Sequence, residues 1–354
     1  MHNSTSKKFV KDYIEFYITN VCNFNCDNCN RFNNYYFSGH ELWSDHADEY
    51  QQWSTKVDFE HISILGGEPT LNSDLSTWVR ELRNLWPNAK MSVVTNGSKL
   101  KYWHQRGFFD LLANTNTELL ISLHNRSRYQ DFVTEIKSYL IAPKETYVSM
   151  VKSMVKWKMA YVDVKDPSWP DCENYEDFLN LPEHIKKECI ETHKIGYDDF
   201  VKNTGILELE DERGVKIRVT YFENFWSAPI FYTGNNKFSV YDSDPEQAHK
   251  VCISKTCTHM MKGKMYKCHN VALLPEFSKQ FDVVMTGDQK NLLSAYQPLE
   301  SGAEDLTMSA FLEELPNTIP QCNVCPSKLE HFSLKSTTDK LKIKKKIFDI
   351  KLIN

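Results

Sequence analysis

Ten cysteines stand out in this chain of 354 residues, because eight of them fall into three groups whose spacing suits metal ligands. Cys22, Cys26 and Cys29 form a C-x3-C-x2-C set near the start of the sequence. Three thiolates at this spacing can bind one four-iron, four-sulfur cluster and leave one iron without a protein ligand. An open iron of this kind can bind a substrate or a cofactor. The plainer alternative is a zinc site that lacks its fourth ligand.

The other two cysteine groups lie in the last third of the chain: Cys252, Cys257 and Cys268, and then Cys322 and Cys325. The segment CTHMMKGKMYKC predicts two short strands around a turn at Gly263, a hairpin that would bring Cys257 and Cys268 together. Cys252 and Cys268 are an alternative pair, in the pattern C-x10-G-x4-C. Two separated thiolate pairs suit tetrahedral zinc as well as a second iron–sulfur cluster.

Composition indicates the cellular compartment and the kinds of partner expected for this protein. The sequence has no run of about 18 uncharged apolar residues and no secretory signal, so we expect a cytoplasmic protein without a membrane partner. Cytoplasmic cysteines serve metal or redox chemistry more often than disulfides. The net charge of -5 argues against broad nucleic-acid binding. Cys172 and Cys189 stand alone, and we interpret them as small buried residues outside the sites.

The elements that must position the first cysteine group alternate between short apolar runs and amphipathic stretches, a pattern typical of parallel β/α folds. The loops that end these runs carry CNFNCDNC, GGEPT, TNG and HN. Such folds gather their active-site groups on these loops. The sequence therefore predicts an α/β fold, a partial barrel of parallel strands with a small cysteine-rich C-terminal module. The strands are expected at Tyr13–Thr19, His61–Leu65, Met91–Thr95 and Leu119–Leu123.

Helices are expected between these strands, and the pattern weakens after residue 142. Further elements are predicted as a strand at 160–164, a helix-rich stretch at 174–203 and a strand at 215–222. We divide the chain into the barrel (1–244), the module (245–335) and a basic tail (336–354). The predicted helices run from a cap at Asn72 to Leu85, from Trp103 to Leu112 and from Tyr129 to Ile141.

Three motifs together make residues 12 to 125 resemble the radical S-adenosylmethionine (SAM) superfamily: CNFNCDNC, the run Gly66-Gly67-Glu68-Pro69, and Thr95-Asn96-Gly97. The resemblance implies that Cys22, Cys26 and Cys29 ligate the cluster. It also implies that the amino and carboxylate groups of SAM chelate the open iron, and that an electron from the cluster cleaves SAM to release a 5'-deoxyadenosyl radical.

The same resemblance assigns the cofactor contacts. Gly66, Gly67 and Glu68 would hold the methionine amino group, because glycines admit close backbone approach and a carboxylate favours an ammonium group. The resemblance also implies that Asn96 contacts the cofactor and that Ser122 contacts the ribose of SAM.

The chain departs from the family at the adenine site. Asn28 stands where members commonly place an aromatic residue just before the third cysteine, and no clear match to the adenine motif of a fifth strand is found. Phe24 or Phe32 could substitute for that aromatic residue.

The C-terminal cysteines look like those of the SPASM and twitch modules of this superfamily, which hold auxiliary clusters. The short segment suits a single-cluster, twitch-like module. Five cysteines compete for four positions, and structural zinc is the alternative metal. The first choice is Cys257, Cys268, Cys322 and Cys325, with Cys252 in reserve.

These features predict an enzyme that cleaves SAM and abstracts a hydrogen atom from an unidentified substrate, a peptide or protein side chain or else a sugar or nucleoside. A reductant such as flavodoxin or ferredoxin would supply the electron. The contrasting hypotheses are a noncatalytic iron–sulfur electron carrier and a zinc-stabilised binding protein. The GGEPT loop favours the enzyme, because an electron carrier needs no cofactor loop beside its cluster.

Overall fold

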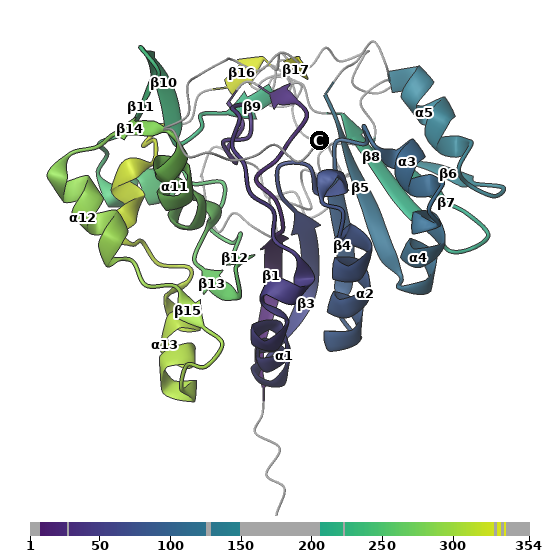
Figure 1. Cartoon of the computed structure of the whole chain (residues 1–354), viewed down its shortest axis with the longest axis horizontal. Coiled ribbons are helices and arrows are strands. Elements are labelled where there is room, and N and C mark those ends of the chain that lie inside the picture. Colours follow the sequence, from purple (N-terminus) through teal and green to yellow (C-terminus); the bar gives the residue numbers. More distant parts are fainter. Residues whose placement is uncertain are drawn as a thin grey trace, which may run out of the picture.

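The computed structural model describes residues 8–26, 28–124, 129–148, 206–221, 224–328, 331–333 and 336–337. In these residues the main sheet has the strand order β15-β13-β12-β1-β3-β4-β5-β8-β7-β6 (Figure 1). Its central strands β1, β3, β4, β5 and β8 are parallel, and the predicted partial barrel is confirmed. The bounds of these strands are Phe9–Tyr17, Val57–Leu65, Lys90–Thr95, Thr117–Leu123 and Lys216–Tyr221, and those of the antiparallel strands β6 and β7 are Lys144–Val148 and Ile206–Glu210.

The first half of the chain supplies the helices that pack on this sheet. Phe16 of β1 is fully buried and contacts Trp78, whose ring centroid lies 6.4 Å away. Burying a side chain of this size contributes roughly 1.5–3 kcal/mol. The apolar face of the sheet thus fixes the strands, and the cysteine loop follows directly from β1. The helices are α1 (Ala47–Lys56), α2 (Leu75–Leu85), α3 (Leu100–His104), α4 (Phe108–Asn114) and α5 (Tyr129–Lys137).

Several predicted helix bounds are wrong. The single helix expected from Trp103 to Leu112 is two helices, because Gly107 between them adopts the left-handed conformation with φ of 74°. Asn72 is not the cap of α2, which begins after Asp74. Instead, the Asn72 amide donates to the carbonyls of Ile18 and Glu41, each at 2.9 Å.

Other predictions lie partly or wholly outside the described residues: the strand at 160–164, the helix-rich stretch at 174–203, Cys172, Cys189 and most of the basic tail. The third predicted helix ends at Lys137 rather than at Ile141, and helix α1 was not predicted.

The C-terminal part continues the main sheet. The predicted hairpin is confirmed as β12 (His259–Met261) and β13 (Lys264–Tyr266), with Lys262 and Gly263 at φ of 52° and 69°. Strand β12 pairs with β1 in parallel, which joins the two parts edge to edge, as Figure 1 shows. The other elements are β10 (Ile230–Gly234), β11 (Lys237–Val240), α10 (Pro245–Lys250), α11 (His269–Gln280), β14 (Asp282–Val284), α12 (Gly287–Ala295), β15 (Leu299–Glu300), α13 (Asp305–Glu314) and the 3-10 helix η4 (Pro320–Val324).

The turn of this hairpin is held by the N-terminal part of the chain. The indole of Trp53 donates to the Gly263 carbonyl at 2.8 Å. The buried Glu41 carboxylate accepts from the Lys262 amide at 2.8 Å and from the Tyr50 hydroxyl. Burial raises the pKa of Glu41, and these hydrogen bonds act in the opposite direction. The hairpin is therefore locked to α1 and to the loop before it.

Two short pairs of antiparallel strands lie outside the main sheet. Strand β9 (Asn224–Trp226) pairs with β16 (His331–Ser333), and β2 (Asn25–Cys26) pairs with β17 (Ser336–Thr337). Within the described residues, no helix combines the length and apolar character needed to cross a membrane.

Candidate functional site

The first cysteine group occupies the loop that follows β1. Cys26 is buried, and Cys22 and Cys29 are partly exposed. The Cys29 amide donates to the Cys26 carbonyl at 3.2 Å, and Asn28 between them has the left-handed φ of 56°. This tight turn brings the second and third cysteines close together along the chain.

The GGE loop after β3 packs directly on this cysteine loop. The Gly67 amide donates to the Thr19 carbonyl and the Glu68 amide to the Val21 carbonyl, both at 2.7 Å. A Cβ atom on Gly66 would lie 2.6 Å from the Thr19 carbonyl oxygen, and one on Gly67 would lie 2.6 Å from the Val21 carbonyl carbon. Both glycines are thus required for the contact between the two loops.

Glu68 joins the ends of β3 and β4. Its carboxylate is 1% exposed and accepts hydrogen bonds from the Thr70 amide at 3.0 Å, the Thr95 hydroxyl at 2.5 Å and the Asn96 amide at 2.7 Å. Burial raises the pKa of Glu68, while these donors act in the opposite direction. The carboxylate therefore fixes the TNG loop. Its expected contact with the SAM amino group stays a prediction.

Asn96 brings the TNG loop to the first cysteine. Its side-chain amide donates to the Asn23 side-chain oxygen at 3.1 Å and lies 3.9 Å from the Cys22 Sγ atom. The Phe24 amide donates to the same sulfur at 3.4 Å. Donors around a sulfur favour its thiolate form, which is the form that binds iron. These residues therefore fit a cluster ligand at Cys22.

Ser122, Phe24 and Phe32 are the remaining candidates for contact with SAM. Ser122 is partly buried on β5, where it pairs with Thr220 of β8. Phe32 is fully buried, and its ring centroid lies 5.4 Å from that of Phe277. Phe32 therefore belongs to the core of the C-terminal part. Phe24 is partly exposed and is the better candidate for contact with adenine.

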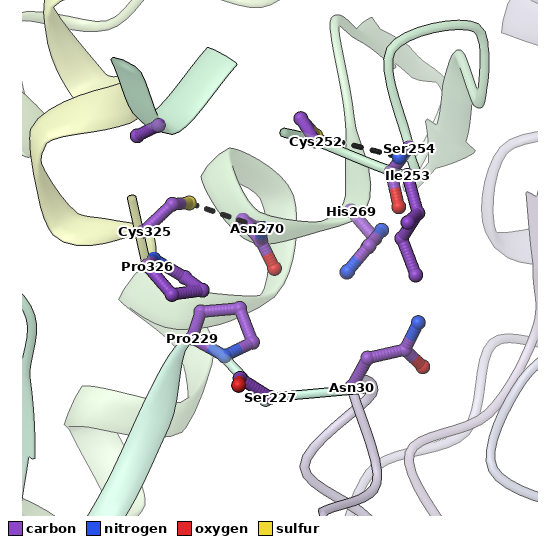
Figure 2. Close-up of a pocket in the computed structure, with 11 residues that line it drawn as sticks. Asn30, Ser227, Pro229, Cys252, Ile253, Ser254, His269, Asn270, Cys325 and Pro326 are labelled. Atoms are coloured by element: carbon purple, nitrogen blue, oxygen red, sulfur yellow. Dashed lines mark hydrogen bonds between the residues drawn. The ribbon is translucent and has the colours of Figure 1, made fainter. Parts of the chain in front are cut away.

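Among the C-terminal cysteines, Cys252 and Cys325 line one small chamber (Figure 2). The pKa of Cys325 is raised well above its ordinary value by burial and then by the negative charges of Cys268, Cys252 and Cys322. The pKa of Cys257 is also raised, by burial and then chiefly by the charge of Glu15. The charges of Cys252 and Cys268 also raise the pKa of Cys257, but they follow that of Glu15, whereas Cys257 is not among the charges that raise the pKa of Cys325.

One of these cysteines accepts a hydrogen bond from a neighbouring side chain. The Asn270 side chain donates to the Cys325 Sγ atom at 3.3 Å. Among the described residues, no three His, Cys, Asp or Glu side chains are grouped as ligands of a single metal ion.

The sequence did not reveal a buried charged network between the two cysteine regions. Arg31 forms an ion pair with Glu15 at 2.6 Å, and His259 Nδ1 lies 3.3 Å from the same carboxylate. Burial would raise the pKa of Glu15, but Arg31 and His259 outweigh it and hold this pKa well below its ordinary range. Burial lowers the pKa of His259 to about 4. A glutamate inside the apolar run YIEFY was the available signal.

Comparison with known proteins defines the class. Residues 16–181, just under half of the chain, match the model of the radical SAM superfamily, which is a superfamily of enzymes. The two cofactors predicted for the N-terminal motifs, a four-iron, four-sulfur cluster and SAM, are those of the superfamily.

Two curated relatives carry the name GTP 3',8-cyclase. The protein of Nautilia profundicola is 30% identical over 97 residues, which are 27% of this chain and 30% of that protein. The protein of Helicobacter pylori is 26% identical over 197 residues, which are 55% of this chain and 57% of that protein. The chain thus spans less than two thirds of either relative.

Two solved structures show a distant likeness. Streptococcus suis SuiB bound to S-adenosylmethionine has a TM-score of 0.39 and 12% identity, over 89% of this chain and 72% of that one. BtrN in complex with AdoMet and 2-DOIA has a TM-score of 0.35 and 11% identity, over 90% of this chain and 93% of that one. Likeness at this level carries no information about the substrate of this chain.

Proposed function

We propose that this chain cleaves SAM reductively and abstracts a hydrogen atom from a substrate that is a peptide or protein side chain, or a sugar or nucleoside. The observation that carries the proposal is the contact between the two loops. The Glu68 amide donates to the Val21 carbonyl at 2.7 Å, so the candidate SAM loop lies beside the residue that precedes Cys22. An iron–sulfur protein that only carried electrons would not need this loop.

Each group of residues has a distinct part in this proposal. Cys22, Cys26 and Cys29 hold the N-terminal cluster, and Asn96 and the Phe24 amide donate to the sulfur of the first. Glu68 fixes the neighbouring loop, while Gly66, Gly67 and Ser122 offer the cofactor contacts. When bound, the cluster and SAM together supply the electron and the 5'-deoxyadenosyl radical. The electron would come from a reductant such as flavodoxin or ferredoxin.

We further propose that Cys252, Cys268, Cys322 and Cys325 hold a second iron–sulfur cluster. Support comes from Cys252 and Cys325, which line one chamber, and from the hydrogen bond that Asn270 donates to Cys325. This choice exchanges Cys257, the first choice from the sequence, for Cys252. Structural zinc is the alternative metal.

GTP cyclisation is a second candidate function. It rests on the names of the two relatives, which match 27% and 55% of the chain. GTP is therefore the first substrate to test, beside peptides and sugars.

Anaerobic reconstitution with iron and sulfide, followed by iron counting and a reductive assay for 5'-deoxyadenosine, tests the proposal. Two four-iron clusters require about eight irons per chain. Alanine at Cys22, Cys26 and Cys29 should remove about four of them and abolish 5'-deoxyadenosine release. The double change Cys172→Ala and Cys189→Ala is the control. Release of 5'-deoxyadenosine by the triple variant would refute the proposal.

A further inference from the structure

Three exposed cations lie on and beside helix α3: Lys99, Lys101 and Arg106, which we call the basic patch. No described residue forms an ion pair with any of the three. The sequence contains no Asp or Glu between the TNG loop and Asp110, and Asp110 is paired with Arg213 at 2.7 Å. In a chain with a net charge of -5, the basic patch is therefore a local reversal of sign.

The side chains of this surface are typical of protein interfaces. Tyr102 is 48% exposed, and the Arg106 guanidinium carbon lies 3.5 Å from the centre of its ring. The same guanidinium donates to the Tyr102 carbonyl at 3.1 Å. Tyr and Arg are enriched at interfaces between proteins. Because Arg106 is already held in place, a partner that binds it loses less side-chain entropy.

A hydrogen bond joins the basic patch to the loop of the first cluster ligand. The Asn23 side-chain amide donates to the Ser98 hydroxyl at 2.8 Å. Asn23 directly follows Cys22, and Ser98 directly precedes Lys99. A partner on the basic patch would therefore lie beside the loop that holds the N-terminal cluster. An electron carrier needs such a short path to the cluster, whereas an anionic membrane or a nucleic acid does not.

The exposed cation near the C-terminal cysteines lacks this uniform charge. Lys250 is exposed on α10, but Asp242, Asp244 and Glu246 precede it and are exposed as well. An acidic partner would meet repulsion there as well as attraction. The basic patch is therefore the better match for an acidic carrier.

We propose that the basic patch is the docking surface for the reductant, an acidic protein that carries single electrons. The inference rests on the proposed function, because it names the surface through which the N-terminal cluster is reduced. In each docking event the carrier is oxidised by one electron and the cluster is reduced by one, and no bond or proton is exchanged. Interfaces of electron-transfer pairs are small, and complementary charge steers the partners together.

Stopped-flow mixing of the reconstituted protein with reduced flavodoxin, which is acidic, tests this surface. In the variant with Lys99→Glu, Lys101→Glu and Arg106→Glu, the second-order rate constant for flavodoxin oxidation should fall about tenfold or more at low salt. Added salt should lower the wild-type rate constant toward that of the variant. Photoreduced 5-deazariboflavin, a small uncharged reductant, needs no docking. The ratio of 5'-deoxyadenosine release with flavodoxin to release with deazariboflavin should therefore fall in the variant.

The matched control reverses three exposed lysines of β4, β11 and α12 with the changes Lys90→Glu, Lys237→Glu and Lys290→Glu. It alters the net charge equally and should keep the wild-type rate constant. Equal losses in the two variants would overturn the docking surface, because net charge alone would then explain them. So would an unchanged rate constant in the first variant, even if that variant no longer bound phosphatidylserine vesicles that retain the wild type.

The two reductants separate the failure of this inference from that of the proposed function. Absence of 5'-deoxyadenosine with both reductants would refute the proposed function, while the rate constant of flavodoxin oxidation would still decide on the basic patch. A wild type that releases 5'-deoxyadenosine with deazariboflavin, but with neither flavodoxin nor ferredoxin, would overturn the docking surface alone.

Discussion

The side-chain amide of Asn96 donates a hydrogen bond to the Cys22 Sγ atom across 3.9 Å, from the loop after β4 to the loop after β1. Hydrogen bonds to the sulfurs of an iron–sulfur cluster raise its reduction potential, because they stabilise the added negative charge. Two loops that are far apart in the sequence thus meet at one cluster ligand.

Asn96→Leu should lower the reduction potential of the N-terminal cluster. A hydrogen bond worth about 1 kcal/mol corresponds to roughly 40 mV for a one-electron couple. Redox titration followed by electron paramagnetic resonance measures the shift, with the exposed Asn84→Leu as control. An unchanged potential at full iron content would show that Asn96 does not act on the cluster.

Gly67→Ala should reduce the iron bound at the first cysteine group. The new Cβ atom would lie 2.6 Å from the Val21 carbonyl carbon and 3.0 Å from the Cys22 nitrogen, so the cysteine loop must move. If Gly67 only contacted SAM, such a change would weaken SAM binding and leave the cluster intact. Iron counting decides between the two outcomes. Gly302→Ala is the matched control, since no atom lies within 4 Å of its Cβ position.

Glu68→Ala should destabilise the protein by about 2 kcal/mol or more, because buried donors of Thr70, Thr95 and Asn96 would lose their acceptor. Urea unfolding of the unreconstituted chain measures this loss without any contribution from cofactors. The control is Glu60→Ala, which changes an exposed glutamate of β3, the strand that precedes the loop with Glu68. Equal effects of the two changes would contradict the role of Glu68 as a tie between β3 and β4.

The pH dependence of stability should reflect Glu41. Burial raises the pKa of Glu41, so the native state keeps a proton that the unfolded chain releases above about pH 4.3. Its stabilising contribution is complete below that pH and is lost as the pH rises through the raised pKa. The stability of the wild type relative to Glu41→Gln should therefore fall as the pH rises above about 4.3. A difference that does not change with pH would refute this assignment.

The two competing C-terminal cysteines can be separated by iron content. In the variant with alanine at Cys22, Cys26 and Cys29, Cys252→Ala should remove most of the remaining iron of about four atoms, and Cys257→Ala should keep it. The reverse result would restore the first choice from the sequence. One tightly held zinc per chain and a colourless protein would show that these cysteines are structural.

The sequence predicted the features that depend on local patterns. The parallel strands, the hairpin at Gly263 and the placement of GGEPT after a strand follow from periodicity and turn chemistry, and the structure confirms them. It missed features that depend on contacts between distant residues. The break at Gly107 depends on a left-handed backbone, and Asn72 is recruited by the carbonyls of Ile18 and Glu41 instead of capping its helix.

The same limit applies to the candidate site. The cysteines and the glycine pair could be found from their spacing. The network of Glu15, Arg31 and His259 could not, because His259 joins the Glu15–Arg31 pair only when β12 pairs with β1. No local pattern in the sequence records a pairing between strands more than 200 residues apart.

The parallel pairing of β12 with β1 has a practical consequence for work on fragments of this chain. A fragment that ends at residue 244 would leave Glu15 and Phe16, the residues of β1 that pair with β12, at an open edge. Such edges recruit other chains through their unpaired backbone groups. The fragment would also leave Trp53 without its acceptor at Gly263. Expression of the N-terminal region alone should therefore yield aggregates, and the chain should be handled as one folding unit.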